Sequence, residues 1–275
     1  MKLVTVLLLI IIKVGDSTVN VNKQEERLGM SSISNNGYKA TCIEYNAAND
    51  IVVEFDDHNI KLHTQWNQFV NNRFSFPINK YGGIKDLMCI DETGRACKEY
   101  ETWFSMYKRC YSESVLNKRP TYINKTVCEE WILYSNFLKW IKSQPNYDKW
   151  FNSDNWSLDK DILQKGNTVY SPDKCCLVPT YVNTLFIKCD SARGKYPVGV
   201  YCRKESGRFK AQCRDPFTNK YVCIGTFDTP EEAFYAYKTY KEDIIKAVAE
   251  KEYKANNITK PCYEAMMKYE VEITD

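Results

Sequence analysis

Histidine is scarce in this chain of 275 residues, which has only His58 and His63. Both lie in a stretch that we expect to be strand or loop, so we do not expect them to hold a metal ion together. None of the twelve cysteines shows the C-x-x-C spacing of zinc sites and redox pairs. Cys110, Cys128 and Cys175 are better explained by buried packing. We therefore expect neither zinc nor a small-molecule cofactor.

Long hydrophobic runs are also absent. The most apolar stretch, Leu3 to Ile12, contains ten residues, which is too short to span a bilayer comfortably. It resembles the core of a signal peptide, but Val14-Gly15-Asp16 lacks the A-x-A cleavage pattern. Three explanations stay open for residues 1–22: a secretion signal, a hydrophobic leader with another role, and a start codon set too far upstream. We expect no membrane partner.

The cysteines bear on the compartment. Twelve of them would suit a secreted protein with disulfides. We expect Cys202, Cys213 and Cys223 on the apolar side of strands, where a reduced thiol behaves as a small hydrophobic group. This favours a cytoplasmic protein of the host cell, with secretion as the minor alternative.

Positive charge is concentrated in one segment. The whole chain has a net charge of +3, whereas residues 193–221 hold eight Lys or Arg and only two Asp or Glu. The rest of the chain is therefore mildly acidic. Such a distribution is typical of a localised face that binds anions.

The predicted fold class is α+β. The sequence shows no repeat and no long linker. Apolar residues make up 44% of the chain, enough to bury several cores. We expect a small β-rich module over residues 24–78, a central helical and ββα domain over residues 99–190, and a sheet domain over residues 193–255. Residues 256–275 are left as a C-terminal tail.

The pattern is clearest in the last domain. Strands are predicted over residues 197–204, 207–215 and 220–227, with turns at Ser206-Gly207 and over residues 216–219. A helix follows, with Thr229 as its cap, Pro230 in its first turn and Glu232 completing a capping box. One helix can cover only one side of a three-stranded antiparallel sheet. The uncovered side is expected to carry Tyr201, Arg203, Arg208, Lys210, Gln212 and Arg214.

A basic sheet face has two interpretations. Charged side chains on a strand can simply be solvated. Alternatively, the sheet lies in the major groove of double-stranded DNA, where Lys and Arg neutralise phosphates and Arg reads guanine. The periodic placement of the cations favours DNA.

The segment YPVGVYCRKESGRFKAQCRDPFTNKYVCIGTFDTPEEAFYAYKTYKEDI resembles the DNA-binding domain of plant ethylene-response factors. That family has Y-x-G-V, G-[KR]-[FW]-x-A, R-D and G-T-F-x-T-x-E-E-A in this order. The resemblance implies base or backbone contacts by Arg203, Arg208, Gln212, Arg214 and Thr226. Lys210 and Lys220 are added as further cations of the same strands. Tyr201 and Cys223 stand where the plant family has Arg and Trp, so its base preference is not transferred.

The centre of the chain resembles HNH-type endonucleases of phages and mobile elements, in which the same sheet domain also occurs. The resemblance rests on TWFSMYKRCY, VCEEWILYSNFLKW and SLDKDILQKGNTVYSPDKC, and it extends from about residue 23 to the end. We expect a strand, a Gly-Asn turn, a second strand and a short helix that Ser171 caps and Pro172 opens.

The resemblance implies a Mg²⁺-dependent nuclease site, but the ββα unit has no histidine. Asp159 stands near the place of the general base, and Asn167 would hold the loop. Asp159 and Asp161 alternate on a predicted strand, so both can face one side and bind Mg²⁺. Carboxylates that merely pair with Lys160, Lys165 or a nearby backbone are the alternative, and the protein is then a non-catalytic DNA-binding regulator with a degenerate domain.

Overall fold

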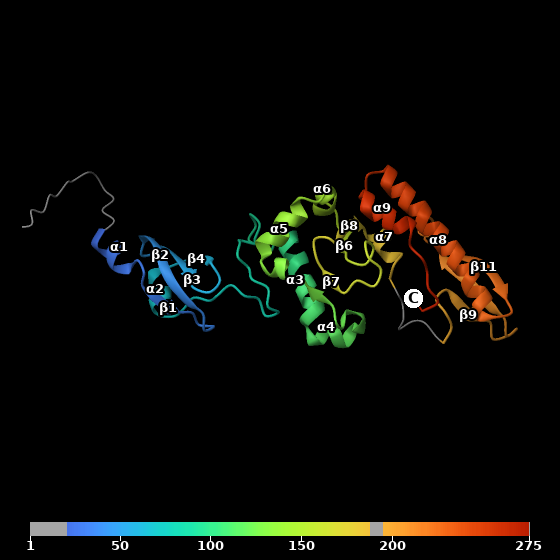
Figure 1. Ribbon diagram of the computed structural model, residues 1–275, viewed down its shortest axis with the longest axis horizontal. Helices are drawn as coiled ribbons and strands as arrows, with labels where there is room; N and C mark the ends of the chain where they lie inside the picture. Colours follow the sequence, from blue (N-terminus) through green and yellow to red (C-terminus); the bar gives the residue numbers. More distant parts are fainter. Residues whose placement is uncertain (1–20, 188–194, 275) are drawn as a thin grey trace, which may run out of the picture. The chain divides into compact units, whose positions relative to one another are not determined.

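A computed structural model describes residues 21–187 and 195–274. It consists of helices and mainly antiparallel sheets and divides into two compact units, Met1–Pro77 and Ile78–Asp275. The expectations for the hydrophobic run Leu3 to Ile12 lie outside the described residues. The architecture agrees with the predicted α+β class (Figure 1).

The first unit is a four-stranded antiparallel meander. After helix α1 (Val21–Arg27), strands β1 (Ser31–Ile33), β2 (Lys39–Ala47), β3 (Asp50–Phe55) and β4 (Ile60–Thr64) pair in chain order. The short helix α2 (Trp66–Val70) closes the unit and buries Phe69. Along β2, alternation buries Ala40 and Cys42, and Tyr45 is buried beyond a register irregularity between Cys42 and Glu44.

The second unit begins with helices packed around aromatic rings. These are α3 (Lys98–Tyr111), α4 (Glu113–Lys118), the 3₁₀ helices η1 (Pro120–Tyr122) and η2 (Glu129–Ile132), α5 (Tyr134–Lys142) and α6 (Tyr147–Phe151). Trp103, Trp131, Tyr134, Phe137 and Trp150 are almost fully buried in one cluster. Aromatic residues at helical spacing therefore build a core here, as their periodicity indicates.

A ββα arrangement follows, with boundaries that differ from the prediction. Strands β6 (Trp156–Asp159) and β8 (Cys176–Pro179) pair antiparallel, and helix α7 (Thr180–Thr184) follows β8 directly. Between them, β7 (Val169–Tyr170) pairs in parallel with β5 (Thr126–Val127).

The predicted helix at Ser171 is wrong. The backbone N–H groups of Lys174 and Cys175 donate to the carbonyl of Ser171, which makes a turn, and the chain then extends into β8. All four residues of β8 are buried. Burial of this apolar run against β6 outweighs a local capping signal, which contributes only about 1 kcal/mol.

The C-terminal sheet agrees with the predicted strands and helix. Strands β9 (Val200–Cys202), β10 (Phe209–Arg214) and β11 (Tyr221–Phe227) form an antiparallel sheet with β10 in the centre. Helix α8 (Pro230–Lys254) starts with the predicted capping box, in which Thr229 and Glu232 bond reciprocally. The expectation for Cys223 is wrong, because a register irregularity skips Ile224 and pairs Cys223 with Gln212, leaving its thiol exposed.

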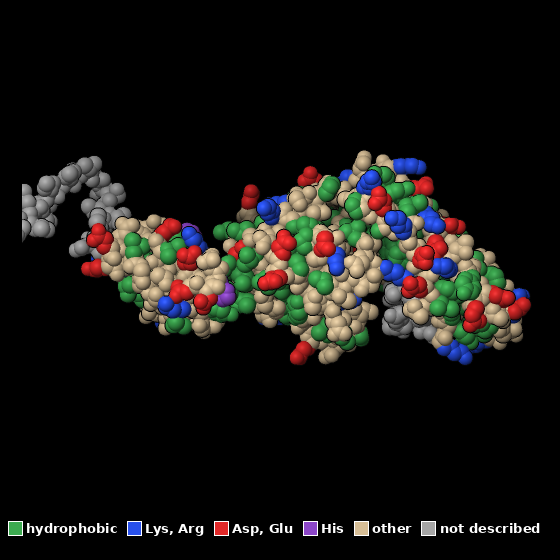
Figure 2. Space-filling model, viewed as in Figure 1, with side chains coloured by type: hydrophobic (Ala, Val, Ile, Leu, Met, Phe, Trp, Pro, Cys, Tyr) green, Lys and Arg blue, Asp and Glu red, His purple; other side chains and the backbone are tan. Residues whose placement is uncertain are grey.

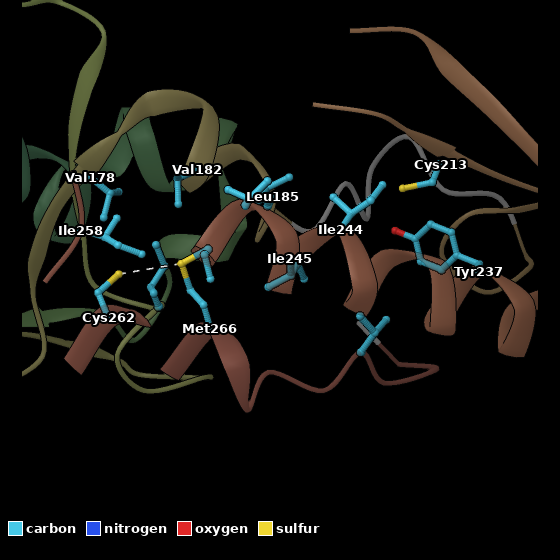
Figure 3. Packing of buried hydrophobic residues seen from close by; sticks show 14 of the residues in the cluster. Val178, Val182, Leu185, Cys213, Tyr237, Ile244, Ile245, Ile258, Cys262 and Met266 are labelled. Carbon is cyan, nitrogen blue, oxygen red and sulfur yellow. Dashed lines mark hydrogen bonds between the residues drawn. The ribbon is translucent and has the colours of Figure 1, made fainter. Parts of the chain in front are cut away.

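Helix α8 connects the sheet to the ββα arrangement through one core. Near its start, Tyr237 packs with Cys213 of the sheet, and further along Ile245 lies with Val178 and Val182 of β8 and α7 (Figure 3). Residues 256–275, which the sequence leaves as a tail, include helix α9 (Lys260–Met267), whose Cys262 and Met266 are fully buried in the same core. The sheet and the ββα arrangement are therefore held together by shared packing.

Candidate functional site

The first candidate site is the side of the C-terminal sheet opposite α8, which we call the basic face. Its centre is Lys210 of β10, which lies between Tyr201 of β9 and Thr226 of β11. The Lys210 ammonium is 5.5 Å from the centroid of the Tyr201 ring. A hydrogen bond with Tyr201 raises the pKa of Lys210. Lys210 is therefore a fixed positive charge at neutral pH.

The arginines of the basic face differ in how they are held. The Nε atom of Arg208 donates to Asp228 at 2.8 Å, and its Nη2 donates to the backbone carbonyl of Thr226 at 3.2 Å. Arg203, Arg214 and Lys220 are exposed and form no ion pair within the part of the chain that the structure describes. Arg208 is thus oriented by its neighbours, whereas the other cations are available to an external anion. Figure 2 shows Lys and Arg side chains at the β9 end of the sheet and both charge signs over α8.

The other side of the sheet explains why this face is presented. Ala211 and Cys213 are buried under α8. Gly199 has a φ of +76°, and a Cβ atom there would lie 2.1 Å from the ring of Tyr237. Only glycine allows the helix to pack this closely, so the sheet has one covered side and Gln212 and Arg214 point away from it.

The second candidate site surrounds Asp159. Asp159 is the last residue of β6 and is only 6% exposed. Its Oδ1 atom accepts hydrogen bonds from the backbone N–H groups of Asp161, at 2.8 Å, and Ile162, at 2.7 Å. The carboxylate therefore caps the turn that ends the strand. Its Oδ2 atom has no hydrogen-bond donor among the described residues.

Asp161 is not where the alternation predicts it. It lies in the turn after β6, and both of its carboxylate oxygens accept bonds from the Lys160 ammonium, at 2.7 and 2.6 Å. The strand ends at Asp159, whose carboxylate accepts from the backbone N–H groups of Asp161 and Ile162 and so holds the following residues in a turn. The two carboxylates thus do not form the expected pair on one strand face, and Asp161 has a cation partner already.

Asn167 lies where the loop returns to β7 and is 3% exposed. Its Nδ2 atom donates to the carbonyl oxygens of Lys160, at 2.8 Å, and Val169, at 2.7 Å, and its Oδ1 atom accepts from the Val169 N–H at 3.1 Å. The expected contact of an asparagine that holds the loop is therefore present. It joins the backbone at Lys160, between Asp159 and Asp161, to the start of β7 at Val169.

A cavity of about 410 Å³ brings these residues together with α7. Its lining includes Asp159, Lys160, Asp161 and Asn183. Sequence reasoning missed Asn183, which is half-buried on α7. The sequence feature that could have identified Asn183 is its place on the short helix after the second strand. The prediction started that helix too early, at Ser171, and this error concealed the position of Asn183.

The environment of Asp159 changes its protonation. Burial raises the pKa of the carboxyl group to about 6, although the two backbone N–H groups and Lys160 oppose the shift. A carboxyl group with this pKa can be ionised at neutral pH and can still exchange a proton there. An aspartate with an ordinary pKa is a weak base at neutral pH, and the raised pKa of Asp159 makes it a stronger one.

The donor set around the cavity has limited capacity for a metal ion. Within residues 21–187 and 195–274, no group of three His, Cys, Asp or Glu side chains could hold one. Asp159 and Asn183 line the same cavity, and their side-chain oxygens are hard donors. Mg²⁺ keeps several waters and commonly takes only one or two protein carboxylates together with substrate phosphates. The residues present fit such an ion and do not form an all-protein cage.

Comparison with known proteins gives no assignment, since no protein-family model and no solved structure matches the chain. Across the residues that the structure describes, the helices are too short or too polar to cross a membrane.

Proposed function

We propose that this chain binds double-stranded DNA through the basic face and hydrolyses a phosphodiester bond at the Asp159 cavity. The observation that carries the proposal is the basic face itself. A three-stranded sheet with one side under α8 leaves Arg203, Lys210 and Arg214 on the other side. A small sheet of this kind fits the major groove, where cations contact phosphates and guanine edges.

Two features favour DNA over simple solvation. Among the described residues, the cations of the basic face are not balanced by acids, since only Arg208 has a carboxylate partner there. Solvated surfaces commonly mix both charge signs, as α8 does with the Lys254–Glu250 pair. The resemblance to plant ethylene-response factors names Arg203 and Arg214 among its contact positions but not Lys210, and the proposal carries it over for binding alone and not for base preference.

For the reaction, we propose an HNH-like site in which Asp159 acts as general base or as metal ligand. As a base, its Oδ2 atom takes a proton from water, and the water oxygen forms a bond to phosphorus. The bond from phosphorus to the leaving sugar oxygen breaks, and that oxygen keeps the bonding pair and takes a proton from solvent. Asn167 holds the loop in register, and Lys160 neutralises Asp161. A Mg²⁺ ion held by Asp159 and Asn183 would stabilise the charge that develops on the phosphate.

The first experiment is a binding selection on a random-sequence duplex library with Mg²⁺ present, followed by sequencing and mapping of the DNA ends. A shared motif with breaks at a fixed offset is the expected result. Random sequences recovered without enrichment would contradict sequence-specific binding. The variant D159N serves as the matched control, because it should recover the same motif on intact DNA.

A non-catalytic regulator is the second candidate function. It is favoured by one observation, that Lys160 already neutralises Asp161, so Asp159 is the one carboxylate in the described lining of the cavity without an ion-pair partner. In that case the selection recovers a motif on intact DNA from both the wild type and D159N, and the metal changes nothing.

A further inference from the structure

We propose that a second, separate cleft of this protein binds the phosphodiester backbone of the same DNA, next to the Asp159 cavity. The proposal rests on the proposed function and names a substrate contact that the basic face does not provide. The cleft has a volume of about 700 Å³ and lies between α3, α4, α6 and β6. We call it the α3–α4 cleft.

Charge is the first observation. Among the described residues, five cations line the α3–α4 cleft, and Glu101 is the single carboxylate in its lining. The cations are Lys98, Lys108, Arg109, Lys118 and Arg119. An excess of one sign in a concave, partly desolvated surface strengthens the local potential and raises the concentration of anions there.

Availability is the second observation. Lys98 has a structural role, because its ammonium donates to the carbonyl oxygens of Trp150, at 2.6 Å, and Ser153, at 2.8 Å. Lys108, Lys118 and Arg119 are exposed, and in the described part of the chain they form no ion pair. These three side chains lack an internal counter-charge and can therefore neutralise an external one.

Continuity with the Asp159 cavity is the third observation. Arg109, Leu158 and Asn183 line both hollows. Arg109 is half-buried, its Nε atom donates to the Ser105 carbonyl at 3.2 Å, and its guanidinium lies 5.5 Å from the centroid of the Tyr170 ring. A chain of phosphates lying in the α3–α4 cleft would pass this fixed arginine and reach Asn183.

The lining also indicates what part of the nucleic acid is bound. Trp150 is 2% exposed, so its ring face is not available for stacking on a base. Trp156 also lines the cleft and is half-buried, but the exposed charged groups are ammonium and guanidinium ions spread along two helices, which suit a row of phosphates rather than one small anion. The cleft is therefore assigned to backbone positioning and not to base recognition.

The test compares two double variants in the full-length protein. K118A/R119A removes two exposed cations of the cleft, whereas K139A/K142A removes two exposed lysines of α5 that line neither hollow. Binding of the selected duplex is measured over a range of salt, and the protected backbone is mapped by hydroxyl-radical footprinting. The slope of log K against log salt is negative, and each lost phosphate contact makes it less steep by about 0.9.

We expect K118A/R119A to make that slope less steep by about one to two and to lose protection on the flank beside the cleavage position. K139A/K142A should retain the wild-type slope and footprint. A wild-type slope and footprint in K118A/R119A would overturn this inference and leave the proposed function intact. Absence of duplex binding by the wild type would overturn both. K118Q/R119Q repeats the test if the alanine variant melts earlier than the wild type.

Discussion

The side-chain amide of Asn167 donates to the backbone carbonyl of Lys160 at 2.8 Å, which joins two points seven residues apart across the loop after β6. The same side chain bonds the N–H and the carbonyl of Val169. One buried residue thus completes the loop that carries Asp159 and Asp161.

Replacing Asn167 by alanine should lower the free energy of unfolding by about 2 to 4 kcal/mol, because buried backbone groups lose their partners. Urea unfolding measures this. The matched control is N152A, since Asn152 is exposed and bonds only the Asp148 carbonyl. A loss no larger in N167A than in N152A would show that water replaces the lost bonds.

Replacing Asp159 by asparagine should stabilise the protein near neutral pH in metal-free buffer. The folded-state pKa of about 6 lies above the ordinary value of 3.8, so ionisation costs the folded state. The gain should be absent below about pH 4, should grow as pH rises through about 6, and should reach about 1 to 3 kcal/mol.

Thermal unfolding at several pH values tests this prediction, with D243N on the exposed side of α8 as the control. A D159N effect that is the same at acidic and neutral pH would mean that burial does not perturb Asp159. With Mg²⁺ added, only the wild type should gain stability, because ligand binding to the folded state alone raises its unfolding free energy.

On the basic face, R214A should weaken duplex binding by about 5- to 100-fold, the range of one arginine contact to a base or phosphate. Arg214 is exposed and unpaired within the described residues, so its loss should leave the melting temperature unchanged. Fluorescence anisotropy with a labelled duplex measures the affinity. The control K268A removes an exposed cation beside α9 and should bind as the wild type does. If R214A binds the duplex with wild-type affinity, Arg214 is not part of the interface.

The contact between α7 and α8 predicts a pH-dependent loss of stability. The hydroxyl of Tyr181 donates to the buried carboxylate of Glu252, and Asn257 donates to the other oxygen at 2.7 Å. Burial opposes ionisation of Glu252, but these bonds outweigh it and hold the pKa of Glu252 below its usual 4.5.

Y181F should therefore lower the unfolding free energy by about 1 to 3 kcal/mol near neutral pH. The folded pKa is depressed, so this contribution is present above about pH 4.5 and declines as pH falls through the folded value. Urea unfolding at neutral and acidic pH measures it, with Y235F, an exposed tyrosine of α8, as control. If the loss of unfolding free energy in Y181F stays constant on acidification, the Tyr181 hydroxyl does not act through the ionised carboxylate of Glu252.

The sequence by itself determined the local elements with strong signals. The capping box at Thr229 and Glu232 defined the start of α8, and alternation along β10 placed Arg214 on one face and Cys213 on the other. These patterns are local, because a cap, a turn or an alternating strand is specified by residues within a few positions of one another.

Only the tertiary structure decided what distant segments do together. It turned the residues after Ser171 into β8, because burial against β6 exceeds a capping preference. It placed Asn183 on the Asp159 cavity, moved Cys223 to the exposed side through a register irregularity, and packed α9 into the core that α8 shares with β8. Such contacts join residues far apart in the chain, and their free energy comes from apolar surface that no local pattern records.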